Sequence, residues 1–205
     1  MTMEDKKKLE TLRHSTSHVL AEAVKELYPE VKLAIGPAIE EGFYYDFDYS
    51  ESFAPEDLKK IEHKMKEIIR KNEKFEKLSV SEKEAKEILK HEPYKLELMN
   101  ELEEKPTFYK SGNFIDLCKG PHIESTGEIK AFKLTKVAGA YWKGDSQNKQ
   151  LQRIYGTCFD AQKELEEHLH LIEEAEKRNH LKIGKELDLF SIHEEGPGFP
   201  FWHNN

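Results

Sequence analysis

The chain is organised around the stretch Asp116-Leu117-Cys118-Lys119-Gly120-Pro121-His122, in which a thiol and an imidazole lie four residues apart. A carboxylate stands two residues before the cysteine, and a Gly-Pro pair precedes the histidine. Much earlier, His14-Ser15-Thr16-Ser17-His18 places two more imidazoles four residues apart. Residues i and i+4 of a helix share one face, so both imidazoles of this second stretch would point the same way. We therefore expect three histidines and one cysteine to line one pocket.

The composition indicates a folded, polar protein. The 205 residues suit one large domain, or one domain with an appendage. Charged residues make up 35%, but aromatic residues reach 10%, which argues against disorder. We expect no signal peptide, and no apolar run reaches the roughly 20 residues of a membrane span. With only Cys118 and Cys158 there is no disulfide framework, so we expect a reduced, cytoplasmic protein without a membrane partner.

One segment is basic although the net charge is −8. Residues 130–153 carry six basic residues against the single acid Asp145. The basic residues are Lys130, Lys133, Lys136, Lys143, Lys149 and Arg153. Tyr141 and Trp142 lie among them, and basic segments with interleaved aromatic rings can bind phosphates and stack bases. The alternative is a strand pair whose lysines face water.

The pattern of apolar residues predicts alternating helices and strands. Helices are expected at residues 4–28, 54–72, 81–90 and 161–178, with a weak helix or irregular segment at 94–106. Strands are expected at residues 31–39, 42–48, 75–80, 106–109, 114–117, 129–137, 140–142 and 151–159. Alternation along the second strand sends Phe43, Tyr45 and Phe47 to one face. Short turns between several strands predict hairpins, and therefore antiparallel sheet.

The four-residue cluster permits several kinds of chemistry. Three imidazoles and one thiolate are an acceptable tetrahedral ligand set for zinc, structural if all four bind and catalytic if water replaces one. The same side chains could instead line a polar pocket that holds a substrate and a water without metal. Cys118 could also act as a nucleophile beside His122, although no oxyanion hole can be identified in the sequence. Finally, the four residues could be unrelated.

Several motifs, in order along the chain, resemble the amino-terminal editing region of bacterial-type threonyl-tRNA synthetases. They are Arg13–His18, Ala34–Pro37, Gly42–Asp46, Asp116–His122, Ala138–Asp145 and Leu151–Thr157. That region is related to the editing domains of alanyl-tRNA synthetases. The resemblance implies an α+β fold in which an antiparallel sheet packs with helices. It also implies an editing domain at residues 1–160, a long linker helix at 161–183, and the truncated start of a class II catalytic domain at 184–205.

The resemblance also implies an activity. Such domains hydrolyse serine wrongly attached to tRNA(Thr) by water attack on the ester, and spare threonyl-tRNA(Thr). The expected partners are the seryl-bearing acceptor end of tRNA(Thr) and a synthetase catalytic domain in cis or in trans, and no aminoacylation is expected of this chain. The alternatives are a tRNA-binding module without catalysis and a zinc-stabilised structural domain.

Residue roles follow from the same resemblance. Those expected to serve catalysis are His14, Lys95, Asp116 and His122, with His14 and Lys95 acting on the water. Those expected to bind substrate are His18, Tyr45 and Cys118, and Asp116 and Tyr45 would contact the seryl group or the terminal ribose. Those expected to contact tRNA are Lys133, Lys136, Tyr141, Trp142, Lys143 and Arg153. No metal is expected to be required, although zinc could bind His14, His18, Cys118 and His122.

Overall fold

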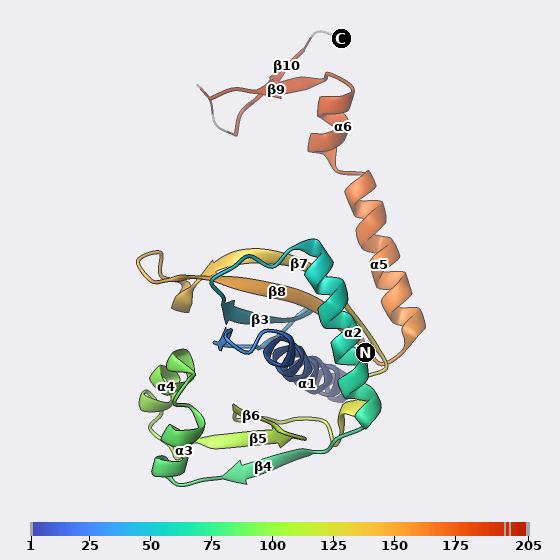
Figure 1. The fold of residues 1–205 in the computed structure, drawn as a ribbon. Coiled ribbons are helices and arrows are strands. Elements are labelled where there is room, and N and C mark those ends of the chain that lie inside the picture. Colours follow the sequence, from blue (N-terminus) through green and yellow to red (C-terminus); the bar gives the residue numbers. More distant parts are fainter. Residues whose placement is uncertain (1, 195, 197, 204–205) are drawn as a thin grey trace. The chain divides into compact units, whose positions relative to one another are not determined.

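Helix α1 (Met3–Leu27) runs between two antiparallel sheets in the larger of the chain's two units (Figure 1). The computed structural model describes residues 2–194, 196 and 198–203, and the two units are Met1–Leu165 and Glu166–Asn205. Thr2 and Asp5 form a capping box at the start of α1. The helix ends at Leu27, before Pro29, so the predicted helix at 4–28 is confirmed.

The larger sheet packs against one side of α1. Its strands are β1 (Lys32–Leu33), β2 (Ala38–Ile39), β3 (Gly42–Asp48), β7 (Ala131–Tyr141) and β8 (Gln150–Phe159). Their order is β1-β3-β8-β7, with β2 also paired to β3, and every pairing is antiparallel. The predicted alternation is confirmed, because Phe43, Tyr45 and Phe47 are all fully buried in the core.

Two strand predictions were wrong. The single strand expected at 31–39 is two short strands, β1 and β2, separated by residues 34–37. The strands expected at 129–137 and 140–142 form the single strand β7. Gly139 does not interrupt it, since this residue pairs with Gln152 within the ladder to β8. β8 pairs with β7 along the whole length of β7, with a register shift between Leu134 and Lys136.

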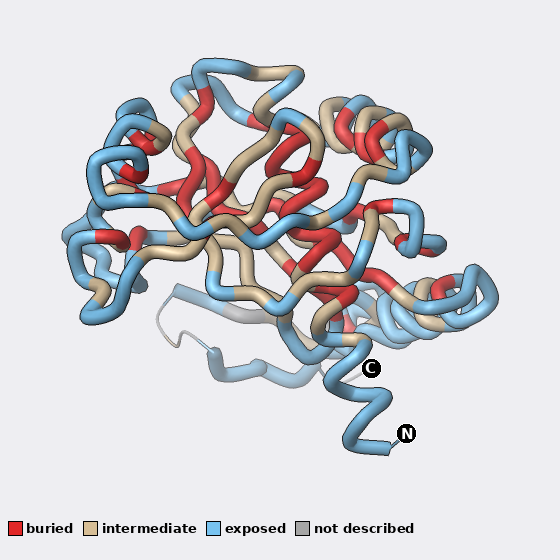
Figure 2. The backbone as a smooth tube through the Cα atoms, turned by 90° about the horizontal axis from the view of Figure 1, so that it is seen from below, coloured by how far each residue is buried: buried red, intermediate tan, exposed pale blue. Residues whose placement is uncertain are grey.

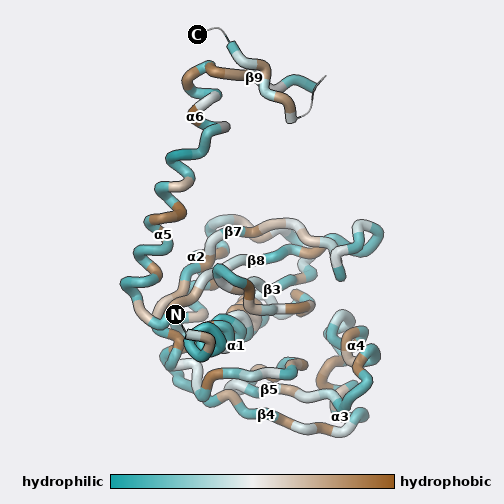
Figure 3. The backbone as a smooth tube through the Cα atoms, turned by 180° about the vertical axis from the view of Figure 1, so that it is seen from behind, coloured by the Kyte–Doolittle hydropathy of each residue, from teal (hydrophilic) through white to brown (hydrophobic). Residues whose placement is uncertain are grey.

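The smaller sheet lies on the other side of α1, as Figures 1 and 3 both show. Its antiparallel strands are β4 (Phe75–Ser79), β5 (Thr107–Ser111) and β6 (Phe114–Leu117), in that order. The remaining helices of this unit are α2 (Pro55–Lys71), α3 (Glu82–Ile88) and α4 (Pro93–Asn100). Two short 3₁₀ turns are η1 (Thr126–Glu128) and η2 (Trp142–Gly144). Helices packed on antiparallel sheets confirm the α+β fold class.

The second unit begins within α5 (Gln162–Lys177), a largely hydrophilic helix (Figure 3). It continues with α6 (His180–Glu186) and an antiparallel hairpin of β9 (Phe190–Ile192) and β10 (Pro200–Trp202). The helix expected at 161–178 is confirmed by α5, whereas the domain boundaries at 160 and 183 stay a prediction. Among the described residues, none of the helices is long and apolar enough to cross a membrane.

Burial is concentrated in α1 and the strands around it (Figure 2). The buried part of α1 is unusually polar for a central helix. Its buried polar residues are Arg13, Ser15, Thr16, Ser17, His18 and Glu22. Several of them bond to segments far away in the sequence. Arg13 donates to the carbonyls of Cys158 and Glu40, and Ser17 donates to the carbonyl of Gly36. Polar contacts therefore help to fix the position of α1, in addition to apolar packing.

Glu22 is the exception, because its side chain is 3% exposed and one carboxylate oxygen has no hydrogen-bond partner among the described residues. An oxygen of Glu73 and the hydroxyl of Ser111 are unpartnered in the same way. Burial, the largest cause, and the nearby carboxylates of Glu73 and Glu26 together raise the pKa of Glu22 to about 8, against the opposing effect of Lys71. Glu22 is therefore largely protonated in the folded chain at neutral pH.

We expect Glu22→Gln to remove a pH-dependent loss of stability. Between pH 4.5 and about pH 8 the folded chain holds a proton on Glu22 that the unfolded chain has lost. The free energy of unfolding therefore falls as the pH rises, by up to about 1.4 kcal/mol per pH unit, and the glutamine variant lacks this contribution. Urea unfolding at several pH values should show the variant about 4 kcal/mol more stable than wild type near pH 8 and little different near pH 4.

Glu4→Gln is the matched control, because Glu4 is an exposed carboxylate of the same helix and is not among the groups that shift the pKa of Glu22. It should keep the pH dependence of the wild type. Equal pH dependence in Glu22→Gln and wild type would contradict the buried, protonated state of Glu22.

Candidate functional site

The two sequence motifs meet in one cluster. His14 and His18 come from adjacent turns of α1, Cys118 directly follows β6, and His122 follows the turn after it. One ligand atom from each of the four residues lies within 4.8 Å of those of the other three. The Sγ of Cys118 is 3.4 Å from Nε2 of His14 and 3.3 Å from Nε2 of His122. The convergence of the four residues expected from the spacings is therefore observed.

Gly120 gives the turn its shape. Its φ is +74°, and a Cβ there would lie 2.4 Å from the hydroxyl of Tyr109, so only glycine fits. Its backbone N–H donates to Sγ of Cys118 over 3.2 Å, and the peptide bond to Pro121 is cis. The Gly-Pro pair in the motif thus brings Cys118 and His122 to the same point.

The outward-facing nitrogens of two histidines have partners that can only accept a hydrogen. Nδ1 of His14 lies 3.3 Å from the carbonyl of Pro121, and Nδ1 of His18 lies 3.4 Å from Oδ2 of Asp116. A carbonyl and a carboxylate have no hydrogen to give, so we assign the ring hydrogen of both histidines to Nδ1. Their Nε2 atoms then carry lone pairs that can accept a hydrogen or bind a metal, and that of His14 lies 3.4 Å from the thiol of Cys118.

All four groups are electrically neutral near neutral pH. Burial, the largest cause, and the adjacent rings of His18 and His14 together lower the pKa of His122 to about 2. Burial also lowers the pKa of His14 and of His18. Burial raises the pKa of the Cys118 thiol to about 11. Nucleophilic cysteines have a lowered pKa, so this environment disfavours Cys118 as the nucleophile.

Asp116 joins four elements of the fold beneath the cluster. Its side chain accepts from the ammonium of Lys95 over 2.7 Å and from the hydroxyl of Tyr45 over 2.7 Å, and it faces His18. Lys95 comes from α4, Tyr45 from β3 and His18 from α1, while Asp116 itself lies in β6. Lys95 is 4% exposed and Asp116 is 1% exposed. The pair is thus withdrawn from water and holds the histidine in place.

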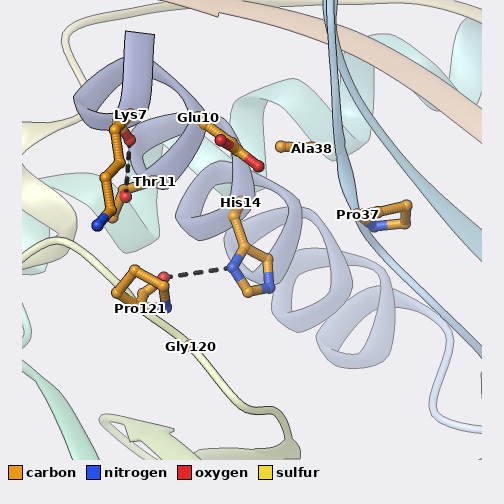
Figure 4. A pocket seen from close by; sticks show the side chains of 8 residues that line it. All are labelled: Lys7, Glu10, Thr11, His14, Pro37, Ala38, Gly120 and Pro121. Atoms are coloured by element: carbon orange, nitrogen blue, oxygen red, sulfur yellow. Dashed lines mark hydrogen bonds between the residues drawn. The ribbon is translucent and has the colours of Figure 1, made fainter. Parts of the chain in front are cut away.

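A cleft of about 330 Å³ opens beside the cluster (Figure 4). Its lining residues are Lys7, Glu10, Thr11, His14, Pro37, Ala38, Gly120 and Pro121. His14 is therefore the cluster residue that borders this cleft, with Pro37 on one side of it and Pro121 on the other in Figure 4. A substrate entering this cleft would meet the imidazole of His14 first.

The structure brings all seven predicted catalytic and substrate-binding residues together, but several of the predicted tRNA contacts are engaged within the chain. Lys133 pairs with Glu62 of α2, Lys143 pairs with Glu97 of α4, and Arg153 pairs with Asp46 of β3. Trp142 is buried against Tyr94. Lys136 lies over the ring of Tyr155, and Tyr141 is exposed. Acids from other elements thus balance much of the basic charge that the sequence shows between residues 130 and 153.

Sequence reasoning missed the residues that hold His122. Phe75 stacks on its ring at 4.8 Å, Tyr109 meets it edge-on at 4.5 Å, and the hydroxyl of Ser15 lies 3.0 Å from its Nδ1. The available signal was the run of small hydroxyl residues between His14 and His18 on an inward-facing helix. Nothing in the sequence marks Phe75 or Tyr109, because they come from β4 and β5, which neighbour β6 in the smaller sheet but lie apart from His122 in the sequence.

The donor set fits a zinc ion. Three imidazole nitrogens and one sulfur are ligands that zinc binds tetrahedrally, and the four ligand atoms are already close together. Histidine ligands of metals usually donate their other ring N–H to a carbonyl, a carboxylate or a similar partner, and His14 and His18 have such partners here. The cluster could therefore bind zinc with little rearrangement.

The sequence of the chain is similar to those of known tRNA synthetases. Residues 107–155 match the family described as threonyl and alanyl tRNA synthetase second additional domain. The chain is 58% identical over 99% of its length to proteins named threonine–tRNA ligase from Clostridium kluyveri and Clostridium botulinum. It is 57% identical over 98% of its length to the one from Acetivibrio thermocellus. The chain spans about a third of the length of these curated relatives, 32% or 33% in each case.

We expect Lys95→Met to destabilise the fold strongly, because it leaves the buried carboxylate of Asp116 without its cation. Breaking a buried pair on one side costs about 3–5 kcal/mol. Urea unfolding of the variant measures this loss. Lys86→Met is the control, since Lys86 pairs with Glu82 on the surface and such pairs contribute about 0–1 kcal/mol. A loss in Lys95→Met as small as in the control would show that Asp116 does not depend on Lys95.

We also expect the cluster to bind Co²⁺, used as a coloured substitute for zinc, at one ion per chain. A cobalt–thiolate bond gives an absorption band that amino and carboxyl ligands do not, and zinc should abolish it by competition. Cys118→Ser should remove this band, whereas Cys158→Ser should retain it because Cys158 is buried in β8 away from the cluster. A band that persists in Cys118→Ser would place the metal elsewhere.

Proposed function

We propose that this chain, which carries the second additional domain of threonyl and alanyl tRNA synthetases, is a proofreading module that hydrolyses seryl-tRNA(Thr) and spares threonyl-tRNA(Thr). The observation that carries the proposal is the convergence of His14, His18, Cys118 and His122 beside an open cleft in a chain with this similarity. The activity of the whole synthetase is not proposed for it.

The need for such a site follows from the size of one methyl group. Serine differs from threonine by one methyl, and a pocket gains only about 1–3 kcal/mol from such a difference. A synthetic site that accepts threonine therefore also accepts serine at an appreciable rate, and a second site removes the error. In this second site the methyl of threonine must keep the ester out of the reactive position, because weaker binding alone would not give enough selectivity.

His14 is the proposed general base. It borders the cleft, its hydrogen-bonded Nδ1 fixes its orientation, and its Nε2 carries a free lone pair. A water held at this nitrogen can give up a proton as it attacks the carbonyl of the seryl ester. The leaving group is the terminal ribose hydroxyl of the tRNA, which takes up a proton when the ester bond breaks. His122 is the second imidazole within reach of the same water.

The buried residues have supporting roles in this proposal. Asp116 is paired with Lys95 and bonded to Tyr45, which supports a role in orienting His18 and in setting the electrostatic field at the cluster. Cys118, a neutral thiol, completes the wall between His14 and His122. Lys95, Asp116 and Tyr45 are buried, so the substrate would have to reach beyond the cleft to contact them directly.

Zinc is not needed for the steps above. When bound to the four residues, a zinc ion would act as a Lewis acid for a water or an ester carbonyl once one ligand position is open. The tRNA partner is expected at the surface near Lys136 and Tyr141, which lie in β7. The proposed substrate is the acceptor end of tRNA(Thr) carrying serine.

The test is deacylation of seryl-tRNA(Thr) and threonyl-tRNA(Thr), with and without a chelator. We expect rapid loss of serine, slow loss of threonine, and little effect of the chelator. His14→Ala should lower the rate of serine release by about 100-fold or more, because general base catalysis contributes about 10²–10⁴-fold. His63→Ala is the matched control, since the side chain of His63 is 74% exposed on α2 and should leave the rate unchanged.

The same assay separates the alternatives. Binding of the tRNA without hydrolysis would indicate a tRNA-binding module and refute the proposal. Unfolding on chelation, without hydrolysis, would indicate a zinc-stabilised structural domain. Unchanged hydrolysis in His14→Ala would remove that residue from the mechanism.

A further inference from the structure

Ser15 is fully buried between the two histidines of α1 and makes three polar contacts. Its Oγ lies 2.9 Å from the carbonyl of Thr11, 3.0 Å from Nδ1 of His122 and 3.1 Å from the backbone nitrogen of Ile123. Ser15 therefore connects α1 to the ring of His122 and to the backbone of the next residue, Ile123. The proposed mechanism makes no use of this residue.

Counting hydrogens decides the direction of these bonds. A serine hydroxyl has one hydrogen to donate and two lone pairs that accept. If the hydroxyl donates to the carbonyl of Thr11, it can accept from the N–H of Ile123 and from Nδ1–H of His122, and all three contacts are hydrogen bonds. If the hydroxyl instead donates to Nδ1 of His122, its bond to Thr11 is lost. The second arrangement gains only a weak bond from Nε2–H to the sulfur of Cys118 in exchange for the bond to the carbonyl of Thr11, so the first arrangement is favoured.

The ring of His122 has little freedom to choose otherwise. Phe75 is stacked on one face at an interplanar angle of 6°, and Tyr109 meets the ring edge-on. Nδ1 is therefore held toward Ser15 while Nε2 faces Cys118 at 3.3 Å. Packing fixes the orientation of the ring, so the hydroxyl of Ser15 at Nδ1 and the thiol of Cys118 at Nε2 decide which nitrogen carries the hydrogen. The hydroxyl oxygen is the stronger acceptor of the two.

We propose that Ser15 is a positioning residue that holds His122 as its Nδ1–H tautomer and so presents the free lone pair of Nε2 to the pocket. Its consequence for hydrolysis rests on the proposed function, whereas the tautomer itself does not. With His122 in this state, the three imidazoles of the cluster share one tautomer, and no ring N–H occupies the position where a water would donate. In the other tautomer Nε2–H would point at Cys118 and the pocket would lose one acceptor.

The tautomer can be read directly. Two-bond ¹H–¹⁵N correlation spectra of the full chain distinguish a protonated from an unprotonated nitrogen in each histidine ring, and they do so without any substrate. We expect wild type to show Nδ1–H for His122. Ser15→Ala should shift this ring toward Nε2–H, and serine release should slow by about 10–100-fold, the usual effect of removing such a partner, mainly in kcat. Ser15→Thr, which keeps a hydroxyl, should restore both.

Thr16→Val is the matched control. Thr16 is the next residue of α1, is equally buried, and likewise donates to the carbonyl four residues earlier, but its other contact is Cys158 and not a histidine. It should leave the tautomer and kcat unchanged. An Nε2–H tautomer in wild type would overturn the proposal, and this reading does not depend on whether any variant folds. An unshifted Nδ1–H tautomer in folded Ser15→Ala would overturn it too.

Failure of the proposed function would look different. Wild type that shows the expected tautomer but releases no serine would refute hydrolysis and leave the role of Ser15 in orienting His122 supported.

Discussion

The buried carboxylate of Asp116 is the constraint on which the site depends. An ionised carboxylate is stable inside a protein only when charges and hydrogen bonds replace the lost water. Here the replacements come from Lys95, Tyr45 and His18, which belong to three different elements. Satisfying one charge therefore forces α4, β3 and α1 to meet at the end of β6. The cluster of imidazoles and thiol lies where these elements meet, so its geometry follows from the needs of the carboxylate.

The polar character of α1 has the same origin. A helix between two sheets would ordinarily present apolar residues on both sides, but this one buries six polar residues. Three of them bond to loop segments that the helix holds in position: Arg13 to Glu40, Ser15 to His122 and Ser17 to Gly36. Ser17 fixes the segment at Gly36, and Arg13 fixes the end of β8 through the carbonyl of Cys158. The helix gives up some apolar packing and gains defined positions for the two walls of the cleft.

The sequence predicted what local spacing determines. Two features depend on the period of a single element: the i, i+4 pair of histidines and the buried face of Phe43, Tyr45 and Phe47. The hairpin of β5 and β6 depends on a short turn. The pocket of His14, His18, Cys118 and His122 was predicted because its halves are two such local motifs. The pairing of Lys95 with Asp116 was not, although both residues were singled out separately. The acids that balance Lys133 and Lys143 were missed for the same reason: they lie on distant helices, and no local pattern reports a contact of that range. The single strand β7 shows a related limit, since the ladder to β8 overrode the local preference of Gly139.

The hydrogen positions explain why water, and not the thiol, is the better nucleophile for this pocket. The Nδ1 atoms of His14 and His18 are bonded outward, so the inner surface of the cluster presents lone pairs. A water bound there donates hydrogens to the nitrogens and keeps its own lone pairs for a carbonyl entering from the cleft. The thiol of Cys118 has the opposite character, because burial keeps its proton on and no cationic group in contact with it takes that proton away. The same set of lone pairs would also receive a metal ion. The inward-facing nitrogens can thus hold either a water or a metal ion, and these two compete for the same lone pairs.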